Sequence, residues 1–183
     1  MLGREVLIGV TGGIAAYKTA VLVSRLVQAG AGVSVVLTKS ATKLISPRTF
    51  QALTGRPVQV AMYRAQDSFP HLEPARKAEI FCVAPATANI LAKAACGIAD
   101  DLVSTLLLAF SGPVLFAPAM NAVMWQQPAV QRNVRQLTED SRLFIGPESG
   151  HMACGEIGPG RMAEPDAIFE KIKTLLQSVC LQK

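Results

Sequence analysis

The 183-residue chain is long enough for one ordinary domain, and a composition that is 50% apolar and only 17% charged excludes a disordered protein. Its apolar runs are far shorter than the ~18 residues that a membrane helix needs. Its first residues also lack the long apolar stretch of a secretory signal, so we expect a cytoplasmic protein with no membrane partner. The net charge of +5 is scattered and aromatic residues make up 5%, which argues against a nucleic-acid surface and favours an anionic small ligand.

Short β-rich runs alternate with helical stretches along the whole chain. In order, the pattern predicts a strand at 5–10, a helix at 14–29, a strand at 33–37, a helix at 47–53, a strand at 80–84, a helix at 87–96, a strand at 114–117, a helix at 128–137, a strand at 143–145 and a helix at 165–179. Continuous apolar strands separated by helices are typical of a parallel sheet covered on both faces. We therefore expect an α/β fold, with residues 1–183 forming one doubly wound domain of the Rossmann-like or flavodoxin-like kind.

The four cysteines show no C-x-x-C spacing. Neither a metal site nor a disulfide framework is therefore expected. Cys82 and Cys96 fall within predicted elements, and we expect both to be small core residues. Cys154 has different surroundings, because it lies among glycines in the segment 146–165.

Small and polar residues follow each predicted strand, and ligands of doubly wound sheets bind outside the carboxyl ends of the strands. The segments that follow the five strands are Thr11-Gly12-Gly13, Thr38-Lys39-Ser40, 85–89, 118–121 and 146–165. The last of these is rich in glycine and proline, and we expect it to be a flexible loop.

The first of these segments, with the sequence Gly9-Val10-Thr11-Gly12-Gly13-Ile14, ends a strand and opens a helix. Small residues let the backbone approach an anion, and a helix N-terminus offers N–H groups and the positive end of its dipole. A tight turn without a ligand would look similar. The spacing is not G-x-G-x-x-G, and Thr38-Lys39-Ser40 stands where a dinucleotide fold places a ribose-binding acid. Hydroxyls and a lysine suit a phosphate monoester, so the pattern favours a mononucleotide such as FMN over NAD.

The string Pro118-Ala119-Met120-Asn121-Ala122-Val123-Met124-Trp125 follows the fourth strand. An amide such as that of Asn121, placed among apolar side chains, can hold a carboxylate in a partly dry pocket. A proline-punctuated loop with two packing residues is the alternative when the string is taken alone.

Taken together, five blocks of the sequence resemble the flavin-containing cysteine decarboxylases, and among them most closely the phosphopantothenoylcysteine decarboxylases. The blocks span nearly the whole chain and comprise residues 11–16, His71-Leu72-Glu73, residues 84–88, residues 118–125 and residues 153–162. The chain departs from the family pattern at Pro74, at Glu79, where aspartate is common, and at Thr87-Ala88-Asn89-Ile90, where the family usually has Ser-Ala-Asn-Thr.

The resemblance implies a role for each matching residue. It implies that His71 is the catalytic base, that Asn121 binds the substrate carboxylate, and that Cys154 donates a proton from a substrate clamp over 146–165. In that clamp His151 and Ala153 would contact substrate, although a solvated His151 remains the alternative. The residues implied to bind FMN are Gly12, Gly13, Ile14, Thr38, Lys39, Ser40, Thr87, Ala88, Asn89, Ile90 and Ala119.

The implied reaction is the FMN-dependent decarboxylation of 4′-phosphopantothenoylcysteine in coenzyme A synthesis. It proceeds through a thioaldehyde and an enethiolate. The substrate is thus a phosphorylated cysteine conjugate, and Arg161, Lys39 and Arg48 are all candidates for its phosphate. The resemblance also implies a trimer or an assembly of trimers such as a dodecamer, with a synthetase as a possible separate partner. Alternative functions are a peptidyl-cysteine oxidative decarboxylase, a flavin prenyltransferase and an FMN-binding regulatory protein.

Overall fold

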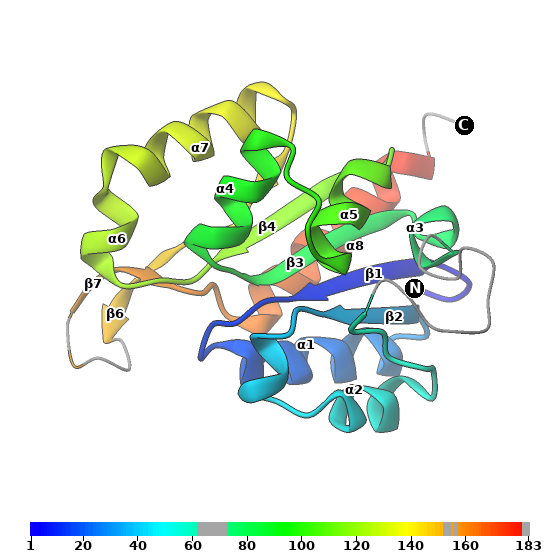
Figure 1. The fold of residues 1–183 in the computed structure, drawn as a ribbon. Helices are drawn as coiled ribbons and strands as arrows, with labels where there is room; N and C mark the ends of the chain where they lie inside the picture. The colour runs from blue at the N-terminus through cyan, green and yellow to red at the C-terminus, as the bar shows by residue number, and fades with distance from the viewer. Residues whose placement is uncertain (62–72, 152–154, 156, 181–183) are drawn as a thin grey trace.

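Five parallel strands form the central sheet in the order β2-β1-β3-β4-β5 (Figure 1). The computed structural model describes residues 1–61, 73–151, 155 and 157–180. The strands of the sheet are β1 (Glu5–Val10), β2 (Gly32–Leu37), β3 (Ile80–Ala86), β4 (Val114–Pro118) and β5 (Leu143–Phe144). Glu5 of β1 lies opposite Gly32 of β2, and Val6 lies opposite Ile80 of β3. The order reverses direction next to β1, which creates a topological switch point between β1 and β3.

Helices cover both faces of this sheet, and a short hairpin stands beside it (Figure 1). The helices are α1 (Ala16–Gln28), η1 (Ala41–Lys43), α2 (Pro47–Thr54), α3 (Glu73–Lys77), α4 (Ala88–Cys96), α5 (Leu102–Ala109), α6 (Ala122–Gln126), α7 (Pro128–Glu139) and α8 (Pro165–Cys180). The hairpin consists of the antiparallel strands β6 (Glu148–His151) and β7 (Ile157–Arg161).

Alternate residues of each central strand enter two different apolar cores. Val6, Ile8 and Val10 of β1 pack with α1, α2 and α8, whereas Leu7 packs with α4, α5 and α7 on the other face. This period of two follows from strand geometry, and burial on both faces explains why the strands are apolar throughout. The predicted fold class, a parallel α/β sheet with helices on both faces, is confirmed.

The short helices η1, α3 and α6 were not predicted from the sequence, and the structure differs from the prediction in three further ways. Helix α5 was not predicted, although Asp101 and Ser104 form a capping box at its start, with Ser104 N donating to Asp101 Oδ1 at 2.9 Å. The expected loop at 146–165 contains the β6–β7 hairpin. Cys96 is exposed at the end of α4 rather than in the core, so that expectation was wrong, whereas Cys82 is buried. Burial raises the pKa of the Cys82 thiol to about 12, and this side chain therefore packs as a neutral, apolar group.

Candidate functional site

Two adjoining cavities open at the carboxyl ends of the strands. The first has a volume of about 950 Å³ and is bounded by the start of α1, the segment 119–124, the hairpin and the start of α8. The second has a volume of about 720 Å³ and lies between the segment 38–40 and the start of α4. Gly12, Thr87, Ala88 and Met124 line both cavities, so the two form one continuous cleft beside the switch point.

Gly12 lies where two ligand-side loops come closest together. A Cβ atom built on Gly12 would lie 2.5 Å from the Cβ of Ser40, a separation that real Cβ atoms do not show. Only glycine therefore lets the segment after β1 pack against the segment after β2. The result is a surface of backbone and small side chains along one wall of the second cavity.

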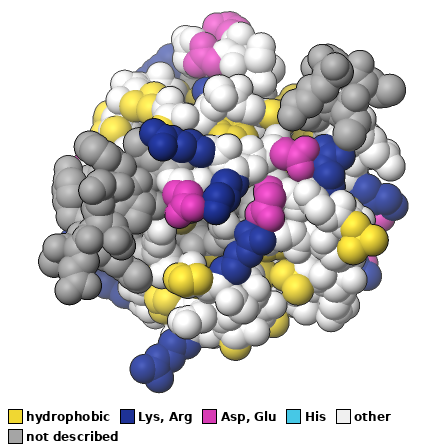
Figure 2. All heavy atoms as spheres, turned by 90° about the vertical axis from the view of Figure 1, so that its right-hand side faces the viewer, with side chains coloured by type: hydrophobic (Ala, Val, Ile, Leu, Met, Phe, Trp, Pro, Cys, Tyr) yellow, Lys and Arg dark blue, Asp and Glu magenta, His cyan; other side chains and the backbone are white. Residues whose placement is uncertain are grey.

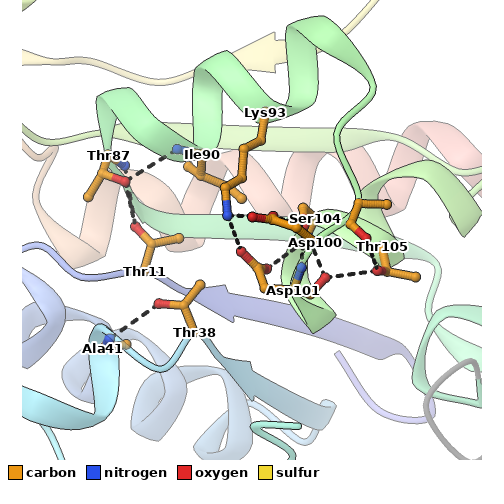
Figure 3. Close-up of polar contacts among 11 residues, drawn as sticks. Thr11, Thr38, Ala41, Thr87, Ile90, Lys93, Asp100, Asp101, Ser104 and Thr105 are labelled. Carbon is orange, nitrogen blue, oxygen red and sulfur yellow. Dashed lines mark hydrogen bonds and ion pairs between the residues drawn. The ribbon is translucent and has the colours of Figure 1, made fainter. Parts of the chain in front are cut away.

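Thr11 fixes the end of β1 to the end of β3. Its hydroxyl donates to the Pro85 carbonyl at 2.6 Å and accepts from Thr87 N at 3.3 Å, and the side chain is only 2% exposed. Thr87 is the N-cap of α4, and its Oγ1 accepts from Ile90 N at 3.4 Å (Figure 3). The first turn of α4 thus faces the second cavity, with the positive end of its dipole toward any bound anion.

Lys39 lines the cleft and makes no ion pair with any described residue. Among the described residues that line the two cavities, the other cations all pair with carboxylates: Lys18 with Glu164, Arg161 with Glu148 and Glu164, and Lys93 with Asp100 and Asp101. Arg48 lies at the start of α2 and lines neither cavity. An anion entering the second cavity therefore meets Lys39, Ser40 and the α4 N-terminus together.

Asn121 is the N-cap of helix α6 and lines the first cavity. Its Oδ1 accepts from Val123 N at 2.7 Å and from Met124 N at 3.3 Å. Because these bonds use the amide oxygen, the amide NH₂ is the group with which Asn121 can bind a carboxylate. Exposed Val123 and Met124 provide apolar surface next to it.

The hairpin is joined to the Asn121 segment and to α1 by short polar contacts. Met120 N donates to the Gly160 carbonyl at 3.0 Å, which links the segment before α6 to β7. Arg161 of β7 contacts Glu148 of β6 and also Glu164, each at 3.2 Å. Glu164 in turn binds Lys18 of α1 at 2.9 Å, and this hydrogen bond lowers the pKa of the Glu164 carboxyl.

The predicted binding residues divide between the two cavities. Lining the first are Gly12, Gly13, Ile14, Thr87, Ala88, Ala119, Asn121 and His151. Lining the second are Gly12, Thr38, Lys39, Ser40, Thr87, Ala88, Asn89 and Ile90. The Ile90 side chain is fully buried in the core. Three predicted residues, His71, Ala153 and Cys154, lie outside the described part of the chain.

Lys93, Asp100 and Asp101 also line the second cavity, and none of the three was predicted from the sequence to be a site residue. Lys93 of α4 places its ammonium 2.6 Å from Asp100 Oδ1 and 2.6 Å from Asp101 Oδ2 (Figure 3). Partial burial acts to lower the pKa of Lys93, but the hydrogen bonds to the two carboxylates outweigh it and the pKa is raised. The helix end at Gly97, followed by the capping pattern Asp101-x-x-Ser104, could have indicated that a new helix begins next to α4.

Neither a metal centre nor a membrane span is found among the described residues. No three His, Cys, Asp or Glu side chains cluster in a way that would hold a metal ion in that part of the chain. None of the helices there is both long and apolar enough to cross a membrane.

A doubly wound sheet with a phosphate-type loop at its switch point defines the class of mononucleotide-binding α/β proteins. The family model described as Flavoprotein matches residues 1–177, and the chain belongs to this family. The family resemblance seen in the sequence is thereby confirmed.

The chain is also similar to bacterial proteins of coenzyme A biosynthesis. The coenzyme A biosynthesis bifunctional protein CoaBC of Bacillus subtilis is 48% identical over 169 residues, which are 91% of this chain and 42% of that protein. CoaBC of Escherichia coli is 44% identical over 172 residues, covering 93% of this chain and 42% of that protein. The chain thus spans less than half the length of these relatives.

Two solved structures are similar over nearly their full length. A PPC decarboxylase mutant complexed with pantothenoylaminoethenethiol matches with a TM-score of 0.84 and 29% identity, covering 95% of this chain and 98% of the other. The FMN-dependent cysteine decarboxylase SpaF matches with a TM-score of 0.85 and 34% identity, covering 97% and 98%.

Proposed function

We propose that this chain binds FMN and decarboxylates 4′-phosphopantothenoylcysteine to 4′-phosphopantetheine, a step of coenzyme A synthesis. The observation that carries this proposal is the continuous cleft, which has an anion receptor around Lys39 at one end and the Asn121 amide at the other. The similarity to CoaBC proteins and to a PPC decarboxylase supports the same activity.

The described residues of the second cavity fit FMN. Lys39, Ser40 and the first turn of α4 would hold its phosphate, and the Gly12 contact with Ser40 leaves the backbone of both loops open to it. When bound, FMN supplies an acceptor for the hydride on the carbon that bears sulfur, without which a cysteine carboxylate has no electron sink for losing carbon dioxide.

The protein's own residues would orient the substrate and move protons. The Asn121 NH₂ donates to the substrate carboxylate and holds it in the apolar part of the first cavity. By the family resemblance, His71 takes the proton of the substrate thiol, and Cys154 donates the proton that completes the saturated product. His151 of β6 lines the same cavity and would contact the substrate from the hairpin.

The proposed assembly is a trimer, or a larger assembly of trimers, in which a neighbouring copy covers part of the first cavity. An apolar stripe on α1 and the turn before it supports this, since Ile14, Tyr17 and Val21 are 62%, 61% and 49% exposed and lie at helical spacing on one face. We propose a cytoplasmic location, with a phosphopantothenoylcysteine synthetase, fused or separate, as the supplier of substrate. Sedimentation of the purified chain tests the oligomer, and a monomer at micromolar concentration would contradict it.

Flavin analysis and a substrate assay test the activity. We expect the purified protein to be yellow, to release one FMN per chain on denaturation, and to evolve carbon dioxide from phosphopantothenoylcysteine. NAD or FAD in place of FMN would overturn the cofactor assignment. Carbon dioxide release only from peptides with a C-terminal cysteine would favour the alternative, a peptidyl-cysteine decarboxylase.

The Cys154→Ser variant tests whether the product is saturated or oxidised. A serine hydroxyl is a far weaker proton donor than a thiol with a pKa of about 8.5. We expect carbon dioxide release in roughly one turnover and an enethiol two mass units below the thiol. Mass spectrometry of the product reports this, and a saturated thiol formed over many turnovers would remove Cys154 from the proposed role.

A further inference from the structure

The second cavity contains three charged side chains that have no role in the proposed function. Lys93, Asp100 and Asp101, here called the Lys93 cluster, come from α4 and from the turn that leads into α5, and all three line the cavity (Figure 3). Two carboxylates and one ammonium give the cluster a formal charge of −1. It is therefore unsuited to a phosphate and suited to groups that donate hydrogen bonds.

The two carboxylates of the Lys93 cluster differ in their contribution to the fold and in their exposure. Asp101 Oδ1 accepts from Ser104 N at 2.9 Å and caps α5, and its side chain is 23% exposed. Asp100 is not the N-cap residue and accepts a long hydrogen bond of 3.4 Å from the Ser104 hydroxyl of α5, and its side chain is 59% exposed at the cavity. Asp100 can therefore be changed with little effect on the fold, and it is the member of the cluster most accessible to a ligand.

The position of the cluster indicates which part of FMN it would meet. The reacting ring of the flavin must lie beside the substrate, whose carboxylate Asn121 would hold in the first cavity. The ring therefore belongs at the boundary between the cavities, near Thr87, Ala88 and Met124, while the phosphate lies by Lys39 and Ser40. The ribityl chain is the part of FMN between the ring and the phosphate. Its hydroxyls would therefore lie next to the Lys93 cluster, which forms a polar wall of the same cavity.

We propose that the Lys93 cluster is a polyol-binding subsite in which Asp100 accepts hydrogen bonds from the ribityl hydroxyls of FMN. Lys93 is a positioning residue that holds Asp100 and Asp101 at fixed places, 2.6 Å from its ammonium. A hydroxylated chain both donates and accepts hydrogen bonds, so it matches a group of two carboxylates and one ammonium. This inference rests on the proposed binding of FMN and concerns how the same site recognises it.

A comparison of three flavins tests the subsite. The holoprotein is exchanged into FMN, riboflavin, which lacks the phosphate, or lumiflavin, which lacks both the phosphate and the ribityl chain. Flavin release on dilution is then followed by the recovery of flavin fluorescence. Asp100→Ala should lower the affinities for FMN and for riboflavin by the same factor, about tenfold for the loss of a hydrogen bond to a charged group. The affinity for lumiflavin should not change. Asp100→Asn keeps an acceptor oxygen and should retain most of the affinity.

Lys39→Met is the matched control at the phosphate end of the cavity. It should lower the affinity for FMN and leave the affinity for riboflavin unchanged. Thermal melting of each variant reports whether the fold is kept. An Asp100→Ala effect on lumiflavin equal to that on riboflavin would overturn the assignment in favour of a ring contact. An effect on FMN alone, or on no flavin, would also overturn it. A wild-type protein that binds no flavin would instead refute the proposed function before any variant is compared.

Discussion

The two ends of the central sheet differ in residue type and in how completely their charges are paired. At the amino ends, Arg4 binds Glu79 at 2.8 Å and Arg56 binds Glu5 at 2.6 Å, so each charge has a partner from a neighbouring element. Figure 2 looks toward this end and shows acidic and basic side chains interleaved. At the carboxyl ends, glycines, hydroxyls and Lys39 line an open cleft.

Because of this difference, we expect the amino ends of the sheet to contribute to stability and the carboxyl ends to contribute to ligand binding. Paired charges at the amino ends satisfy one another and present little field to a ligand. At the carboxyl ends the first turn of α4 and the side chain of Lys39, which makes no ion pair with a described residue, can both bind an incoming anion. Changes at the carboxyl ends should therefore affect binding and turnover, whereas changes at the amino ends should affect the free energy of unfolding alone.

The largest expected effect comes from Asn121→Asp. Aspartate caps a helix as well as asparagine does, so α6 should persist. The variant replaces an NH₂ donor by a negative oxygen, which would face the carboxylate of the proposed substrate. A repulsion of about 4 kcal/mol at 4 Å near a protein surface corresponds to about a thousandfold loss of turnover. Carbon dioxide release measures this loss. Asn133→Asp makes the same chemical change on α7, away from both cavities, and should be neutral.

Gly12→Ala should have the next largest effect, on the affinity for FMN. Its new Cβ would lie 2.5 Å from the Ser40 Cβ, so the loops after β1 and β2 must move apart. Overpacking of this kind costs about 1–3 kcal/mol, which corresponds to a loss of affinity of about 5-fold to 150-fold. The double variant Gly12→Ala/Ser40→Gly removes the clashing atom and should bind FMN as Ser40→Gly alone does. Additive losses in the double variant would contradict a steric origin.

Glu79→Gln should lower stability without affecting FMN. Arg4 Nε lies 2.8 Å and 2.9 Å from the two carboxylate oxygens of Glu79, and Arg4 also donates to the Leu176 carbonyl at 2.6 Å. Both side chains of the pair are more than two-thirds buried, so we expect a loss of about 1 kcal/mol in urea unfolding. Glu170→Gln breaks an exposed pair with Lys173 and serves as the control, with an expected loss under about 0.5 kcal/mol.

Glu5→Gln should produce the smallest effect, and that effect depends on pH. The hydrogen bond from Arg56 holds the pKa of the Glu5 carboxyl below its usual range. The pair therefore contributes stability above the unfolded pKa of about 4.3, and this contribution is lost as the pH falls through the lowered folded pKa. The free energy of unfolding of the wild type should exceed that of the variant by about 0.5 kcal/mol at pH 7. The two values should converge once the pH has fallen below the lowered folded pKa of Glu5. A gap that widens in acid would contradict this assignment.

The sequence was sufficient to predict the central sheet because its strands are buried on both faces. The run of five buried residues from Val6 to Val10 in β1 is too short for a typical helix and has the length of a buried strand. Helix α5 was missed because Leu106, Leu107 and Leu108 read as a continuous apolar run, and only the Asp101 cap marked its beginning. The hairpin was missed because Ser149, Gly150 and Pro159 lack the β-branched residues typical of strands.

The candidate site was only partly accessible to sequence reasoning. Motifs placed Gly12, Lys39 and Asn121 at the strand ends, and the structure brings these segments to one cleft. The Lys93 cluster was not predicted because the contact between Lys93 and Asp100 depends on how the chain turns at Gly97, after the end of α4. The assigned roles of His71 and Cys154 stay predictions, since both residues lie outside the described part of the chain.

One backbone bond has a consequence for how this site can diversify. The hydrogen bond from Met120 N to the Gly160 carbonyl joins the Asn121 segment to the hairpin, and neither partner atom belongs to a side chain. Side chains of β6 and β7 can therefore be replaced while this attachment is kept. Related proteins could in this way differ in the hairpin side chains that line the first cavity and still hold Asn121, the proposed carboxylate-binding residue, in the same place.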